Sequence, residues 1–149
     1  MIKKLLATQN DVAFTILRVI LGFVFIAHGS QKMLGWFGGF GFHGTMRAFT
    51  HMGMPAPVAF LIICTEFFGG MGLIVGLLTR VASLGVCGLM IGAIFMVHLQ
   101  NGFFMNWMGT QKGEGFEYHL LALAMAAAIL LRGAGAFSLD RAITSKIPD

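Results

Sequence analysis

The chain has 149 residues, of which 57% are hydrophobic and only 11% are charged. Soluble domains carry about 25% charged residues, so this composition excludes an ordinary soluble protein and indicates an integral membrane protein with a single domain, residues 1–149. The net charge of +4 lies in connections and ends, which indicates membrane topology rather than nucleic-acid binding.

Four apolar segments are each long enough to cross a bilayer, which takes about 20 helical residues. They run from about 12 to 33, 56 to 78, 81 to 99 and 118 to 136. Only Thr79 and Arg80 separate the second segment from the third, so these two should be antiparallel neighbours. Small residues recur along the second, at Gly69, Gly72 and Gly76, and allow close helix packing. The sequence therefore predicts an all-α integral membrane four-helix bundle.

The basic residues predict the orientation, because cytoplasmic segments are enriched in Lys and Arg. One side of the predicted bundle carries Lys3, Lys4, Arg80, Arg132, Arg141 and Lys146. The other side carries Lys32, Arg47 and Lys112, with two glutamates beside them. We therefore expect both termini in the cytoplasm and the two long connections, residues 35–55 and 100–117, on the outer side.

Both outer connections are rich in glycine and aromatic residues, as GWFGGFGF and QNGFFMNW show. Aromatic rings of this kind suit the membrane interface, where apolar bodies meet lipid and polar edges meet water. Between the first of these runs and the second span, residues 43–53 predict a short interfacial helix that ends at Gly53.

Two charged residues lie inside the predicted spans, where an unpaired charge costs a few kcal/mol. Arg18 is on the first span and Glu66 is on the second, which runs in the opposite direction, so both should lie at a similar depth. We predict an Arg18–Glu66 ion pair in the core of the bundle. The alternative, a pair that only fixes the register of the helices, stays open.

Polar residues also gather at the outer ends of three predicted spans. Arg18, His28 and Lys32 fall within an arc of about 80° on the first helix, at 100° per residue. Antiparallel connectivity brings the outer ends of the other spans to the same place. The predicted ligand-binding residues are His28, Gln31, Lys32, Glu66, His98, Asn101, Glu117 and His119. The alternative is that each of them only extends its polar group to the interface.

The spacing of these residues limits the chemistry. The sequence has no HExxH, no ExxH and no Cys–His ligand pattern, so no metal site is predicted. A haem held by His28 with His98 or His119 is a less favoured reading. Histidine, lysine and glutamine can hydrogen-bond quinone carbonyls, and histidine can move protons near neutral pH. A lipid-soluble redox carrier such as a quinone is therefore the predicted ligand.

Four motifs in combination resemble the DoxX family of small bacterial membrane proteins, including its DoxD-like members. They are HGSQK after the first span, TEFFGG in the second, the GLLTR turn and GAFSLD near the end. The resemblance covers about residues 14–141. It implies a four-helix protein of the bacterial inner membrane, with a link to quinone-coupled oxidation and redox stress. Its motifs carry over to His28, Lys32 and Glu66 as site residues and to Arg80 as a topology anchor.

Together, these patterns predict a membrane subunit of a quinone-linked oxidoreductase or redox-stress system. It would bind a quinone-like apolar ligand at the outer end of the bundle and work with a catalytic partner protein, because side chains alone rarely carry redox chemistry. A structural anchor or assembly factor, and a small-solute or proton pathway, are the alternatives. Whether the chain forms a homo-oligomer, and whether it is itself an enzyme, stays open.

Overall fold

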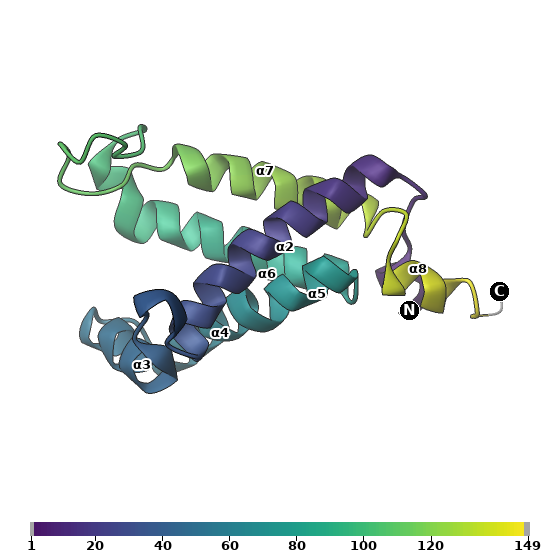
Figure 1. Cartoon of the computed structure of the whole chain (residues 1–149), viewed down its shortest axis with the longest axis horizontal. Helices are drawn as coiled ribbons and strands as arrows, with labels where there is room; N and C mark the ends of the chain where they lie inside the picture. The colour runs from purple at the N-terminus through teal and green to yellow at the C-terminus, as the bar shows by residue number, and fades with distance from the viewer. Residues whose placement is uncertain (1, 148–149) are drawn as a thin grey trace.

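The computed structural model describes residues 2–147, and this part of the chain is entirely helical (Figure 1). The first long helix is α2, Val12–Met33. The second consists of α4 (Ala56–Cys64), the π-helical η2 (Thr65–Gly69) and α5 (Gly70–Val75). The third consists of α6 (Thr79–Ala93), the π-helical η3 (Ile94–His98) and the 3₁₀ turn η4 (Leu99–Asn101), and the fourth is α7, Glu117–Arg132.

Four short elements flank these long helices: α1 (Ile2–Leu6), η1 (Trp36–Gly38), α3 (Gly41–His51) and α8 (Leu139–Thr144). Helices α1 and α8 lie together at one end of the molecule, which we call the terminal end (Figure 1). The connections 34–55 and 102–116 lie at the opposite end, which we call the loop end. Helix α3 is the predicted interfacial helix, begun two residues early.

The all-α membrane fold is confirmed. Within residues 2–147, three helices are long and apolar enough to cross a membrane: Val12–Met33, Ala56–Val75 and Thr79–Asn101. The fourth predicted span corresponds to α7, whose 16 residues extend only about 24 Å, less than the roughly 30 Å of a bilayer core. A complete fourth crossing, and the cytoplasmic position of the termini, stay predictions.

Helix α2 crosses the second long helix at very close range because a glycine on each helix faces the backbone of the other. A Cβ atom on Gly29 would lie 2.5 Å from the backbone nitrogen of Phe67, and one on Gly70 would lie 2.6 Å from that of Ile26. No real side chain tolerates such contacts, so glycine is required at both positions. This crossing sets Gly29 level with Glu66 and Phe67.

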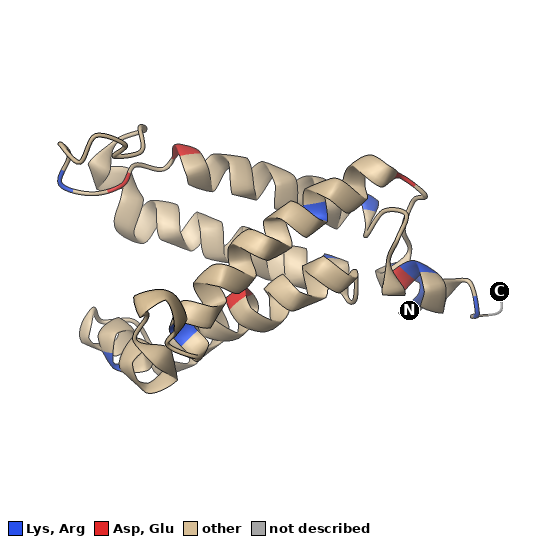
Figure 2. Cartoon of the chain, viewed as in Figure 1, with Lys and Arg blue, Asp and Glu red and all other residues tan. Residues whose placement is uncertain are grey.

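Buried apolar residues from all four long helices form the core, including Leu21, Phe25, Leu73, Val86 and Ile129. Many large apolar side chains instead point outward; Phe23 and Leu131, for example, are 61% and 75% exposed. Charged residues are sparse along the helices and gather at the two ends (Figure 2). Apolar outer faces with charged ends fit a chain surrounded by lipid.

Arg18 is almost fully buried, and all its side-chain hydrogen bonds within the described residues go to backbone carbonyl groups rather than to carboxylates. Its Nε donates to Ala134 at 2.6 Å, its Nη1 to Leu73 and Ile74 at 2.6 Å each, and its Nη2 to Phe137. The predicted Arg18–Glu66 ion pair is therefore wrong. The physical reason is register, because the glycine crossing places Arg18 level with residues 73–76, well toward the terminal end from Glu66.

Asp140 links the end of the chain to the turn between α5 and α6. Its two carboxylate oxygens accept from the backbone N–H groups of Leu78, at 2.7 Å, and Thr79, at 2.9 Å. Its own N–H donates to the carbonyl oxygen of Gly76 at 2.8 Å. The GLLTR and GAFSLD motifs are thus joined to each other by these three hydrogen bonds. Arg80 adds hydrogen bonds to the carbonyl groups of Ala7 and Leu130.

Candidate functional site

Glu66 and Lys32 form an ion pair at the loop end. The Nζ of Lys32 lies 2.5 Å from Oε2 of Glu66, and Glu66 is only 6% exposed. Glu66 lies in the π-helical η2, which inserts an extra residue into the second helix directly opposite α2. π-Helical turns of this kind often occur at functional sites. The two family motifs HGSQK and TEFFGG therefore meet through their charged residues.

His98 and His119 stack on each other, with ring centroids 3.9 Å apart and planes tilted by 38°. His98 ends the second π-helical segment, η3, and its Nδ1 lies 2.8 Å from the carbonyl oxygen of Glu114. A carbonyl oxygen only accepts, so Nδ1 of His98 is the protonated nitrogen of this contact. His119 is 7% exposed, and its Nδ1 has no hydrogen-bond partner.

The second long connection, residues 102–116, folds back onto the start of α7. Glu117 N–H donates to the carbonyl of Phe103 at 2.9 Å, and Phe116 N–H donates to that of Gly102 at 3.2 Å. Gly102 has φ 82° and ψ −169°, a conformation open to glycine and strained for other residues. Asn101 also holds the connection through a 3.0 Å bond from its Nδ2 to the Glu114 carbonyl.

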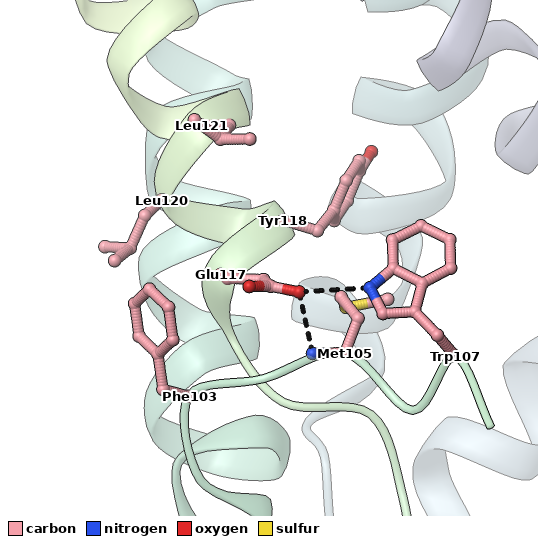
Figure 3. Close-up of a pocket in the computed structure, with 7 residues that line it drawn as sticks. All are labelled: Phe103, Met105, Trp107, Glu117, Tyr118, Leu120 and Leu121. Atoms are coloured by element: carbon pink, nitrogen blue, oxygen red, sulfur yellow. Dashed lines mark hydrogen bonds between the residues drawn. The ribbon is translucent and has the colours of Figure 1, made fainter. Parts of the chain in front are cut away.

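This folded connection and α7 border an open pocket of about 520 Å³ (Figure 3). Its lining residues are Phe103, Met105, Trp107, Glu117, Tyr118, Leu120 and Leu121. Glu117 provides the carboxylate, and its Oε1 accepts from Met105 N–H at 2.9 Å and from Trp107 Nε1 at 3.3 Å. The pocket thus combines three aromatic rings and aliphatic side chains with a few polar groups, the composition usual for small-molecule sites.

Tyr118 connects the pocket to the other polar groups of the loop end. Its ring packs edge-on against His119, with centroids 5.3 Å apart, and its phenol is close enough to Glu66 for an electrostatic interaction. The hydroxyl has no hydrogen bond to any residue in 2–147. Tyr118 therefore offers a hydroxyl without a partner, on a residue that lines the pocket.

The structure places six of the eight predicted ligand-binding residues in three separate groups. Lys32 pairs with Glu66, His98 stacks on His119, and Glu117 lines the pocket, with Asn101 holding the connection that covers it. His28 and Gln31 lie elsewhere, in a separate recess of about 180 Å³ that they line with Ala27 and Phe37. His28 is exposed because the buried face of α2 at this level belongs to Gly29.

Sequence reasoning missed Tyr118 and the apolar lining of the pocket. Tyr118 is the single tyrosine of the chain and stands between two predicted residues, Glu117 and His119. The only sequence feature that could have indicated a role for Tyr118 is that it is a lone tyrosine at the end of a predicted span. The part played by Phe103, Met105 and Trp107 had no signal, because these residues reach α7 only through the folding of the connection.

Comparison with known proteins decides the family. The family model described as DoxX matches residues 13–99. The chain belongs to the DoxX family. Among curated proteins, "Putative oxidoreductase CatD" of Bacillus subtilis (strain 168) is 32% identical over 119 residues, which cover 80% of this chain and 79% of CatD. "Inner membrane protein YqjF" of Escherichia coli (strain K12) is 29% identical over 137 residues, covering 92% of this chain and 96% of YqjF. No solved structure matches.

Membership of the DoxX family and the long apolar helices confirm the predicted location, a bacterial inner membrane that several helices of the chain cross. The matched residues 13–99 include Lys32, Glu66 and His98. Glu117, Tyr118 and the folded connection lie beyond them. The pocket therefore lies mostly outside the segment that the family model matches.

Proposed function

We infer that this DoxX-family protein is a membrane subunit of a quinone-linked oxidoreductase or redox-stress system, and that it binds a quinone-like ligand in the pocket of Figure 3. The pocket itself is the observation that carries this proposal. Its volume of about 520 Å³ is within the range of about 300–1,000 Å³ that small-molecule sites occupy.

The lining of the pocket suits a flat ring with polar substituents. Phe103, Trp107 and Tyr118 offer aromatic faces and edges, against which another ring packs well. Glu117 and Tyr118 supply the polar atoms that would orient it. The pocket lies beside Leu121, which is 68% exposed on α7. A ligand that reaches the site from the lipid and keeps an apolar tail there fits this position.

A catalytic partner is part of the proposal. Side chains rarely carry out electron transfer on their own, because cofactors supply that chemistry. Trp107 and Met108, which are 85% and 88% exposed, project from the connection that covers the pocket. We expect the partner to reach the ligand from this side of the protein. The name of CatD as an oxidoreductase supports a redox role.

Thermal unfolding in detergent with added decylubiquinone or a short-tailed menaquinone tests the proposal. We expect either quinone to raise the midpoint of the wild-type protein in a concentration-dependent manner. The shift should shrink in Leu121→Trp, where the indole fills the pocket, and persist in His28→Ala, whose side chain lies in a separate recess. No shift in the wild type, or equal shifts in all three proteins, would count against quinone binding in this pocket.

The second candidate function is a membrane anchor or assembly factor, and the contacts of Arg18 and Asp140 favour it. These contacts hold the C-terminal segment of the chain against the bundle, which is what a purely structural role requires. Neither residue lines either of the two pockets described above. The anchor hypothesis predicts that a partner copurifies equally well with wild type and Leu121→Trp. A ligand-dependent complex, lost in Leu121→Trp, would favour the redox subunit.

A further inference from the structure

The two oxygens of Glu117 have different surroundings. Oε1 accepts both hydrogen bonds that the pocket provides, from Met105 N–H and Trp107 Nε1. Oε2 accepts none from the described residues. In Figure 3 the second oxygen points away from Trp107, toward the side of Phe103 and Leu120. One oxygen therefore holds the connection in place, and the other has no partner on a residue that lines the pocket.

An ionised carboxylate has acceptor oxygens and no donor. The free oxygen therefore needs a hydroxyl or N–H group on whatever occupies the pocket. A ring hydroxyl would make a charge-assisted hydrogen bond with it, which is stronger than a neutral one. A ring carbonyl at the same place would set two acceptor oxygens against each other, and neither could be satisfied.

We propose that the Glu117 pocket selects the reduced, hydroxyl-bearing form of its aromatic ligand, a hydroquinone, over the oxidised quinone. This rests on the proposed function and adds the redox state of the ligand. The hydroquinone ring lies against Phe103, and one of its hydroxyl groups donates to Oε2 of Glu117. The Tyr118 hydroxyl, which can donate or accept, tolerates either redox state.

The same geometry indicates a membrane hydroquinone rather than a water-soluble phenol. Leu120 and Leu121 continue the pocket along α7 and are 41% and 68% exposed, so they extend its apolar lining toward the lipid. A tail that follows these side chains adds apolar contact area, which stabilises binding by about 25 cal/mol per Å². A ring without a tail keeps the hydrogen bond and loses this contribution.

The decisive experiment measures the affinity of both redox forms of one ligand under anaerobic conditions. Decylubiquinol and decylubiquinone are titrated into the purified full-length protein by calorimetry, and the tail-less ring is titrated in both forms for comparison. We expect the wild type to bind decylubiquinol about tenfold more tightly than decylubiquinone, the ratio that one charge-assisted hydrogen bond provides. The same ring without its decyl tail should keep this preference for the reduced form, and it should bind more weakly than the decyl compounds in both redox forms.

Glu117→Gln is the matched variant because glutamine retains the oxygen that Met105 and Trp107 require. It replaces the free acceptor by an NH₂ donor, so the preference should disappear or reverse toward the quinone. Glu114→Gln is the control, since it removes the same charge from the same connection, outside the pocket lining. It should leave the ratio unchanged.

The outcomes separate this inference from the proposed function. Equal affinity of the wild type for the two redox forms, or tighter binding of the quinone, would overturn the inference while leaving ligand binding intact. Binding of neither form would overturn the proposed function itself. The wild-type ratio needs no variant, so the inference can be tested even if Glu117→Gln does not fold. A wild-type ratio of about tenfold that survives unchanged in Glu117→Gln would also overturn it, because Glu117 would not be its source.

Discussion

At the terminal end, Arg18 donates to four carbonyl groups and Asp140 accepts from two N–H groups, so both buried charges have their hydrogen bonds satisfied. At the loop end, Oε2 of Glu117 and the hydroxyl of Tyr118 belong to residues that line the larger pocket and have no partner among the described residues. The buried Nδ1 of His119 and the buried hydroxyls of Thr79 and Ser83 are unpaired as well, but these three residues line neither pocket described above.

This difference shows which polar groups stabilise the fold and which are available to a ligand. A buried charge whose hydrogen bonds are all made to backbone has a structural role, since removing it leaves those backbone groups unsatisfied. A polar group that borders a cavity without a partner costs stability unless something else binds it. The terminal end therefore holds the bundle together, and the loop end is where a ligand would bind.

The largest expected effect is at Arg18. Arg18→Met removes the donor for four buried carbonyl groups and should lower the free energy of unfolding by about 4 kcal/mol or more. Arg132→Met is the matched control, because Arg132 is exposed and its side chain makes one hydrogen bond within the described residues, to the side chain of Gln9; its effect should stay within about 0.5 kcal/mol. Unfolding in detergent, followed by circular dichroism, measures both. A loss below about 1 kcal/mol for Arg18→Met would show that these contacts do not stabilise the fold.

The next effect concerns Asp140. Asp140→Asn leaves one acceptor for two N–H groups and places an NH₂ group against the other, so we expect a loss of about 2 kcal/mol. Asp11→Asn is the control, since Asp11 caps α2 with one oxygen, at 2.8 Å from Ala13 N–H, and asparagine caps a helix about as well. Thermal unfolding midpoints of the two variants provide the comparison. Equal midpoints would mean that the second oxygen of Asp140 is dispensable.

A smaller effect is expected for the Lys32–Glu66 pair at the loop end. Lys32→Met leaves a buried carboxylate without its partner, so it should destabilise more than Lys32→Met combined with Glu66→Gln. A double-mutant cycle should give a coupling of about 1–2 kcal/mol. In contrast, Arg18→Met and Glu66→Gln should be additive, because these residues do not touch. Coupling between Arg18 and Glu66, with none between Lys32 and Glu66, would show that Glu66 pairs with Arg18 instead.

The smallest effect on stability is expected at Tyr118. Tyr118→Phe removes a hydroxyl that has no partner in the described part of the chain, so the free energy of unfolding should change by less than about 0.5 kcal/mol. If this hydroxyl binds the ligand, the affinity for decylubiquinone should fall roughly fivefold, as expected for one neutral hydrogen bond. Calorimetric titration alongside thermal unfolding separates the two. Unchanged affinity would remove Tyr118 from the site.

The comparison of the two ends also explains which predictions were confirmed. The apolar run from Val12 to Met33 marks α2 without error, because helix length and polarity are local properties of the sequence. The prediction that Glu66 pairs with Arg18 was wrong, because side-chain pairing across helices depends on the register of the helices. The close contact between Gly29 and Phe67 sets that register. Counting residues from the ends of the spans predicts neither this contact nor the π-helical turn beside it.

The sequence by itself determined that this is an all-helical, inner-membrane protein of the DoxX family whose polar residues gather at span ends, because apolar length and motif spacing are written along the chain. The tertiary structure decided which of those residues meet. The crossing of the helices places Glu66 beside Lys32 and leaves His28 exposed. The connection that begins at Gly102 forms the pocket together with Glu117 and Tyr118. These contacts depend on distances between segments far apart in sequence, which backbone packing sets and composition does not encode.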